Sequence, residues 1–118
     1  MKRYCLALDL IDDPDLITAY EAHHKKVWPE IIESIRDSGI TQMEIYRTGN
    51  RLFMIMEVND TFSFAKKNKV DITNPKVKEW ELIMWKYQQA LPQSKPGEKW
   101  RLMDKIFDLN NISKPYAA

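Results

Sequence analysis

Two adjacent histidines, His23 and His24, are the side chains of this sequence best suited to proton transfer. Tyr20, His24 and Trp28 lie four residues apart, so on a helix they share one face. An imidazole that exchanges protons near neutral pH would act there as a general acid and base, beside a phenolic hydrogen-bond donor and an indole wall. The same spacing also fits a half-buried histidine that packs beside aromatic rings. Spacing alone leaves both interpretations open.

The two histidines are poorly placed to hold a metal ion together. On a helix His23 projects about 100° away from His24. A zinc site built on such a helix needs histidines four residues apart and a further ligand, and the sequence offers neither. We therefore expect no metal here.

A second candidate group is Trp80 with its neighbour Glu81. Sugar sites combine an aromatic face, which packs on C–H bonds, with acceptors for hydroxyl groups, and this pair offers both. The alternative is an amphipathic helix with Trp80 in the core and Glu81 in solvent.

The composition argues against several functional classes. The 118 residues carry 18 basic and 17 acidic side chains, and the resulting net charge of +1 is unlike that of nucleic-acid-binding domains. Lys66, Lys67 and Lys69 form a small basic cluster without interleaved aromatic residues, which indicates a solvated surface. The sequence contains no glycine-rich phosphate loop and no nucleophile elbow.

The cysteine content and the hydropathy of the sequence indicate its cellular compartment. Cys5 is the only cysteine, so no disulfide within the chain can form, and a single thiol suits a reducing compartment. The apolar run near Met1 is too short for a signal peptide, and no segment approaches the roughly 20 apolar residues of a membrane span. We expect a cytoplasmic protein that has no membrane partner.

The first half of the chain must position the histidine face. Alternating apolar residues predict a strand over about residues 3–11, and Asp13 with Pro14 predicts the start of a helix that runs to about Ser38. Pro29 lies inside that helix, so we expect a kink or break near Val27–Trp28. Two strands follow, over 41–48 and 51–58, joined by a turn at Gly49.

The second half of the sequence predicts a short helix over 61–67, a long helix over 75–91 that carries Trp80, and a last strand over 100–109. The order βαββαβ indicates an α+β, ferredoxin-like fold: a four-stranded antiparallel sheet with both helices on one face. We expect one domain over residues 1–109 and a tail over 110–118.

The sheet face that the helices leave uncovered indicates whether the protein has a partner. We expect it to carry Cys5, Ala7, Met43 and Ile45, with either Met54 and Met56 or Phe53 and Ile55. A face so apolar predicts a partner, and two sheets packed face to face would form a closed homodimer.

At this point the sequence resembles a known family, the L-rhamnose mutarotases. The resemblance is carried by Tyr20-x-x-x-His24-x-x-x-Trp28-Pro29-Glu30 after an Asp-Asp-Pro turn, by Asn74-Pro75-x-Val77-x-Glu79-Trp80, and by the segment Met103–Leu109. It implies a dimeric α/β-barrel of ferredoxin-like subunits that interconverts the anomers of a 6-deoxy-hexose. It also implies that the protein uses a monosaccharide substrate and no cofactor or metal.

The resemblance also assigns roles by position. His24 matches the proton donor, Tyr20 a sugar-binding tyrosine, and Trp80 the first member of a tryptophan pair whose second member is Glu81 here. Met43 stands where the family has a tyrosine. Both departures change the hydrogen bonds that the pocket can offer, and we expect L-rhamnose first and L-fucose second.

For the reaction that this resemblance implies, we expect His24 to be the acid–base group, Tyr20 to orient the anomeric centre, Trp80 to stack on the ring and Glu81 to accept a hydroxyl. Asp9 is a weaker candidate for a second base. A monooxygenase or haem-degrading protein on the same scaffold and a non-catalytic sugar-sensing module are the competing hypotheses.

Overall fold

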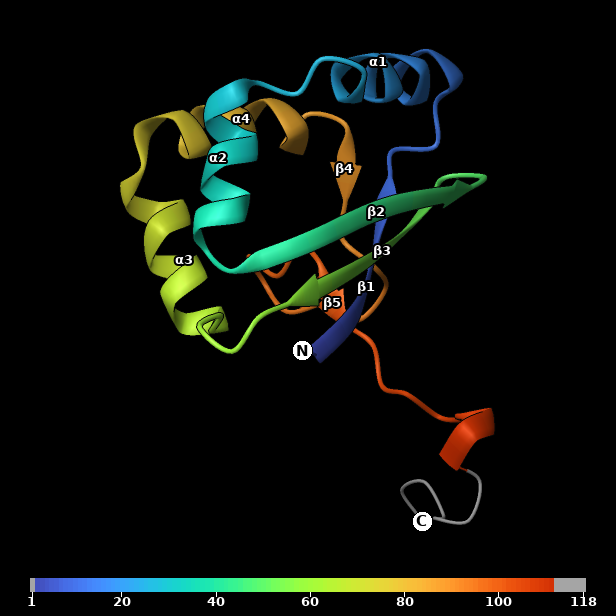
Figure 1. Ribbon diagram of the computed structural model, residues 1–118. Helices are drawn as coiled ribbons and strands as arrows, with labels where there is room; N and C mark the ends of the chain where they lie inside the picture. Colours follow the sequence, from blue (N-terminus) through green and yellow to red (C-terminus); the bar gives the residue numbers. More distant parts are fainter. Residues whose placement is uncertain (1, 112–118) are drawn as a thin grey trace.

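An antiparallel sheet with four α-helices on one face makes up the computed structural model, which describes residues 2–111 (Figure 1). The elements in chain order are β1 (Lys2–Leu10), α1 (Pro14–His24), α2 (Pro29–Asp37), β2 (Ile40–Thr48), β3 (Arg51–Val58), α3 (Phe64–Thr73), α4 (Pro75–Trp85), β4 (Gln88–Gln89), β5 (Arg101–Leu102) and the short 3-10 helix η1 (Leu109–Asn111).

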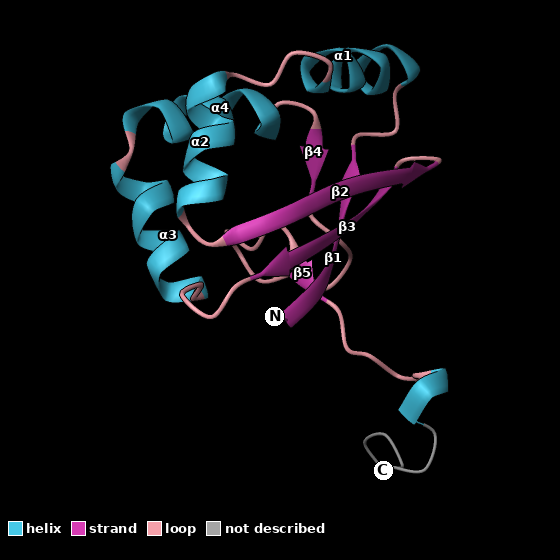
Figure 2. Cartoon of the chain, viewed as in Figure 1, coloured by secondary structure: helices cyan, strands magenta, loops and turns pink. Residues whose placement is uncertain are grey.

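The strand order β2-β3-β1-β4 is that of a ferredoxin-like sheet, as predicted. The fourth strand is split in two, because β4 pairs with Leu10 and Asp9 of β1 while β5 pairs with Ala7 and Leu6 further along it. The loop over residues 90–100 connects these two pieces (Figure 2).

The predicted break in the first long helix is confirmed. Asp13 caps α1, since its Oδ1 accepts hydrogen bonds from the backbone N–H groups of Asp15 and Leu16, and Pro14 occupies the first turn. The helix ends at His24, and Pro29 begins a separate helix, α2, after an extended Trp28. The break therefore leaves His24 in the last turn of α1, next to the connection.

Three boundaries in the second half differ from the prediction. Helix α3 begins after Ser63, whose hydroxyl caps it, and extends to Thr73 rather than ending near residue 67. Helix α4 ends at Trp85 instead of 91, because residues 88–89 pair with β1. The last strand covers only residues 101–102 of the predicted 100–109. Beyond it the apolar residues no longer alternate, since Ile106 and Phe107 are neighbours, and both are exposed.

The two faces of the sheet are now assigned. Leu6, Leu8 and Leu10 of β1 and the even-numbered residues of β3 are buried beneath the helices. The prediction that Met43 and Ile45 belong to the open face is wrong. Met43 pairs with Met56 and Ile45 with Met54, so both share the helix-covered face, after a bulge between Ile40 and Gln42 that shifts the register of β2.

The open face carries Cys5 and Ala7 of β1 with Phe53 and Ile55 of β3, as the pairing of these two strands shows. After β5 the chain leaves the sheet and extends away from the body (Figure 1). The predicted tail begins within η1, and its residues 112–118 lie outside the described part of the structure.

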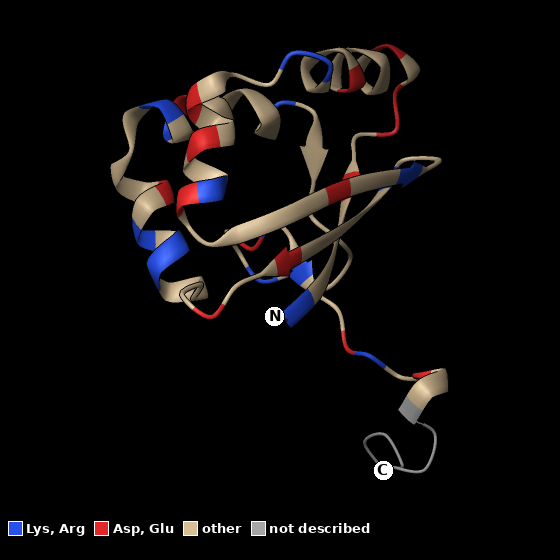
Figure 3. Ribbon diagram, in the orientation of Figure 1, with Lys and Arg blue, Asp and Glu red and all other residues tan. Residues whose placement is uncertain are grey.

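Charge is distributed without a dominant sign. Acidic and basic residues are interspersed over helices and strands (Figure 3). Within residues 2–111, no helix has the length and apolar character needed to cross a bilayer.

Candidate active site

A cavity of about 900 Å³ lies between the helices and the covered face of the sheet. Its size falls in the range of small-molecule binding sites. All five side chains predicted to bind or act on a ligand line it: Tyr20, His24, Met43, Trp80 and Glu81. They come from α1, β2 and α4, so only the tertiary structure brings them together.

The ring of His24 is oriented by a hydrogen bond to the backbone. Its Nδ1 lies 3.0 Å from the backbone oxygen of Tyr20, one turn earlier in α1. A carbonyl oxygen only accepts hydrogen bonds, so Nδ1 must carry the proton. The other ring nitrogen, Nε2, is therefore the one that can accept or release a proton at the cavity.

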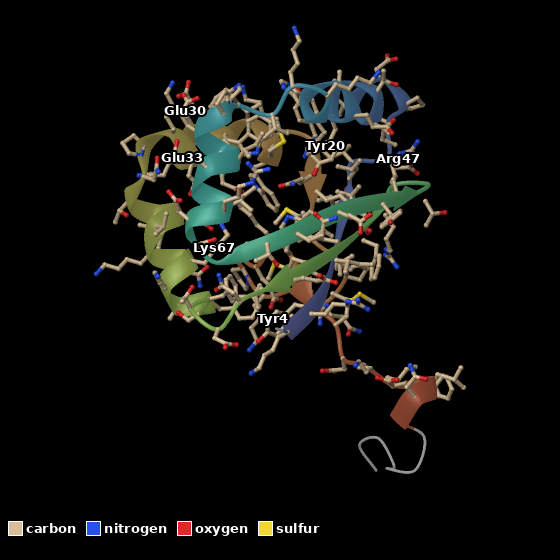
Figure 4. The ribbon with its side chains drawn as sticks, in the orientation of Figure 1. Tyr4, Tyr20, Glu30, Glu33, Arg47 and Lys67 are labelled. Carbon is tan, nitrogen blue, oxygen red and sulfur yellow. The ribbon has the colours of Figure 1, made fainter. Side chains whose placement is uncertain are left out.

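Tyr20 presents a buried phenol beside that imidazole. Its side chain is 3 % exposed, and its ring centroid lies 4.5 Å from that of His24. In Figure 4 it lies between α1 and the sheet. Burial raises the pKa of the Tyr20 hydroxyl to about 12, although a hydrogen bond from Gln88 opposes part of this shift. The phenol therefore stays protonated at neutral pH and can donate a hydrogen bond.

Trp80 is an aromatic wall of the cavity. It is buried, and its ring packs edge-to-face against His24, with centroids 5.9 Å apart. Trp28 also packs edge-to-face against Trp80, with centroids 5.2 Å apart, and is absent from the cavity lining. Trp28 thus supports the wall without reaching the cavity.

Methionines form much of the apolar lining. Met43, Met54 and Met56 contribute from the sheet, and Met84 contributes from α4. Thioether side chains adapt their shape to a ligand and pack well against its apolar parts. This part of the wall offers no hydrogen bonds and suits C–H or methyl groups.

Four charged side chains form what we call the charged group: Lys67, Asp71, Glu81 and Lys99, all of which line the cavity. Lys67 Nζ donates to Asp71 Oδ1 at 2.8 Å within α3 (Lys67 is labelled in Figure 4), whereas Lys99 Nζ lies 3.7 Å from Glu81 Oε2. Burial raises the pKa of the Glu81 carboxyl, and the Lys99 ammonium opposes this change. Glu81 is half-buried and only loosely held, so its oxygens can accept hydrogen bonds from a ligand.

Asp9 does not reach the cavity, and the prediction of a second base there is wrong. It lies on the open face of β1, where its two carboxylate oxygens accept hydrogen bonds from Arg51 Nε and Nη2 at 2.7 and 3.1 Å. His23 also points elsewhere: its Nε2 lies 3.2 Å from the Tyr87 hydroxyl.

Sequence reasoning missed two residues near this site. Lys99 lies in the loop before β5, where no periodic pattern predicts its position. Gln88 was assigned to a helix, yet in β4 it contacts the Tyr20 hydroxyl at 3.4 Å. Across the described chain, no cluster of three or more His, Cys, Asp or Glu side chains could hold a metal ion.

Known protein families provide evidence on this site that is independent of its geometry. The family model described as L-rhamnose mutarotase matches residues 3–109. This chain belongs to the L-rhamnose mutarotase family. It is therefore an isomerase of the mutarotase type with a ferredoxin-like α+β fold.

Individual relatives within this mutarotase family differ in their named sugar. An L-fucose mutarotase from Xanthomonas campestris pv. campestris is 46% identical over 112 residues, covering 93% of this chain and 90% of that protein. An L-rhamnose mutarotase from Paraburkholderia phytofirmans is 21% identical over 112 residues, covering 92% and 97%. The crystal structure of an L-rhamnose mutarotase from Formosa agariphila superposes with a TM-score of 0.68 at 22% identity, covering 92% and 99%.

Proposed function

We propose that this mutarotase interconverts the α and β anomers of a 6-deoxy-hexose, with L-fucose ahead of L-rhamnose as the substrate. The 46% identity to an L-fucose mutarotase carries this order, because the L-rhamnose relative from Paraburkholderia is only 21% identical. The order reverses the expectation drawn from the sequence alone.

The reaction needs only proton transfers. The ring oxygen gains a proton as its bond to the anomeric carbon breaks, and the anomeric hydroxyl loses a proton as the carbonyl forms. Rotation about the bond next to the aldehyde and closure in the reverse sense give the other anomer. No proton is consumed overall, so one group that both gives and takes a proton can serve.

His24 is our candidate for that group. Its Nδ1 proton is engaged by the Tyr20 carbonyl oxygen, so Nε2 alone exchanges protons with the sugar. Tyr20 is proposed to orient the anomeric region as a donor, and Trp80 to stack on the C–H face of the ring. Glu81 is proposed to accept a sugar hydroxyl, and the methionine lining, including Met43, to receive the methyl group.

The test is NMR saturation transfer between the α- and β-anomer signals of each sugar, with and without the purified protein. We expect faster exchange for L-fucose than for L-rhamnose, and faster exchange than in buffer for at least L-fucose. If neither sugar exchanges faster than in buffer, the proposal fails. If the wild-type protein binds a sugar without accelerating its exchange, and His24→Ala leaves that binding intact, the result would instead support a non-catalytic sugar-sensing module.

We also propose that two copies associate through the open face of the sheet. Cys5, Ala7, Phe53 and Ile55 place an apolar patch there, and the exposed Ile106 and Phe107 extend beyond β5. Sedimentation equilibrium should give about twice the chain mass of 14.0 kDa. Ile55→Asp should restore the single-chain mass, since a charge would be buried in the interface. A wild-type mass of one chain would exclude the dimer.

A further inference from the structure

A buried glutamine next to the candidate site has an unusual hydrogen-bond pattern. Gln88 is 6 % exposed and lies in β4 opposite Leu10 of β1. Its Nε2 lies 3.4 Å from the hydroxyl oxygen of Tyr20, and its Oε1 has no hydrogen-bond partner among the described residues.

We propose that Gln88 is a positioning residue of the mutarotase site: its amide N–H holds the Tyr20 oxygen so that the phenolic proton is directed into the cavity. This inference rests on the function proposed above. It concerns a residue that acts through Tyr20 and does not itself line the cavity.

The direction of the Tyr20 phenolic proton follows from which neighbouring groups donate hydrogen bonds and which accept them. An amide nitrogen only donates, so the Tyr20 oxygen accepts from Gln88 and its own proton must go elsewhere. Within residues 2–111 no other group hydrogen-bonds to this hydroxyl, and Tyr20 is part of the cavity wall. The cavity is therefore where a partner for that proton would lie.

The burial of Gln88 argues that the amide serves the tyrosine. A buried amide oxygen without a partner costs free energy, whereas an apolar side chain of similar length would avoid that cost. Gln88 pairs with Leu10, which belongs to the same buried core cluster as Leu52 and Met84, so an apolar residue would suit this position. Among residues 2–111, the one side-chain hydrogen bond that such a replacement would remove is the one to Tyr20.

This arrangement would give the two neighbouring groups different roles. Tyr20 stays protonated at neutral pH, because burial raises its pKa to about 12, so it donates a hydrogen bond without transferring its proton. His24 Nε2 exchanges protons. A phenolic donor of fixed direction would hold a sugar oxygen in reach of that nitrogen.

A double-mutant cycle tests the proposal. Gln88→Met keeps the length of the side chain and removes the amide, and Tyr20→Phe removes the hydroxyl. In the wild-type background we expect Gln88→Met to lower the anomer-exchange rate about threefold to tenfold, as expected for one lost neutral hydrogen bond. In the Tyr20→Phe background the same change should alter the rate less than about twofold. An equal loss in both backgrounds would mean a structural role and would overturn the proposal.

The matched control is Gln89→Met, since Gln89 is the exposed neighbour of Gln88 on the same strand. It should leave the rate unchanged. A second variant, Gln88→Leu, should lower the rate about as much as Gln88→Met, because both side chains lack the amide donor. A wild-type rate in Gln88→Leu would contradict the role of the amide.

A spectroscopic measurement keeps this inference separate from the proposed reaction. The ¹³Cζ chemical shift of Tyr20 at neutral pH, assigned with Tyr20→Phe, reports the hydrogen bond at its oxygen. It should change in Gln88→Met and stay unchanged in Gln89→Met, even if the wild-type protein exchanges neither sugar. Absence of a change in Gln88→Met would overturn the Gln88–Tyr20 contact itself.

Discussion

Two groups of side chains face the same cavity, and they are built in opposite ways. The aromatic group, Tyr20, His24 and Trp80, is made of packed rings on α1 and α4, and Tyr20 and Trp80 are almost completely buried. In the charged group, Lys67 and Asp71 form a close pair at 2.8 Å, whereas Lys99 and Glu81 remain 35% and 40% exposed and their charged atoms lie 3.7 Å apart. Rigid packing suits chemistry that needs fixed geometry, whereas a loose ion pair can rearrange around hydroxyl groups.

This difference predicts that changes in the aromatic group affect rate and stability strongly, and that changes in the charged group affect mainly how tightly the sugar binds. The four predictions that follow can break or sharpen that division.

The largest effect should come from His24→Ala. Loss of a general acid–base group typically lowers the rate about 10² to 10⁴-fold, and the anomer-exchange rate should fall by that amount without loss of the folded state. Saturation-transfer NMR measures the rate, and circular dichroism checks the fold. The matched control is His23→Ala, because His23 contacts Tyr87 and not the cavity, and its rate should stay within about threefold of wild type. Equal losses of exchange rate in the two variants would show that His24 is not the acid–base group.

Trp80→Ala should destabilise the fold itself. Truncating a buried tryptophan costs about 3–5 kcal/mol in unfolding free energy, and the loss of its ring also exposes Trp28 and His24 to a void. Urea unfolding followed by circular dichroism measures this cost. Trp85→Ala is the comparison on the same helix: Trp85 is 38% exposed, so about 1 kcal/mol or less is expected. A similar cost at both positions would contradict a rigid aromatic group.

Glu81→Gln should weaken sugar binding while leaving the maximal rate nearly unchanged. The amide keeps the shape of the carboxylate but accepts hydrogen bonds less strongly, so KM should rise about threefold to tenfold. Exchange rates over a range of sugar concentrations separate KM from kcat. Glu79→Gln is the control, since Glu79 lies outside the cavity lining and pairs with Lys76 on the surface. A fall in kcat with KM unchanged would show instead that Glu81 acts in the chemical step and not in sugar binding.

The smallest effect should be a pH dependence of stability at Glu81. Burial raises the pKa of its carboxyl in the folded state, so the folded protein binds this proton more tightly than the unfolded chain does. The resulting stabilisation is present below the unfolded pKa and is lost as pH rises through the folded one. Relative to Glu81→Gln, the wild type should lose on the order of a few tenths of a kcal/mol across that interval, because the group is partly exposed. Urea titrations of both proteins between pH 4 and 7 measure the difference, and an opposite slope would contradict the burial effect.

Local sequence determined the parts of this protein that depend on single residues and their neighbours. Asp13 and Pro14 start α1, Pro29 separates α2 from it, and Gly49 takes a positive φ of 57° in the hairpin turn. These features arise from backbone sterics and capping within a few residues, so they could be read without the fold. The helical spacing of Tyr20 and His24, and hence their adjacency, belongs to the same class.

Tertiary structure decided the rest. Pairing with β3, across a bulge in β2, turned Met43 toward the helices, and pairing with β1 converted residues 88–89 from helix into strand and brought Gln88 to Tyr20. Asp9 was lost from the site for the same kind of reason, since the pairing of β1 with β3 put it beside Arg51. Hydrophobic periodicity reports that a residue is buried, but which face buries it depends on strand register, and register is fixed only when distant segments pair.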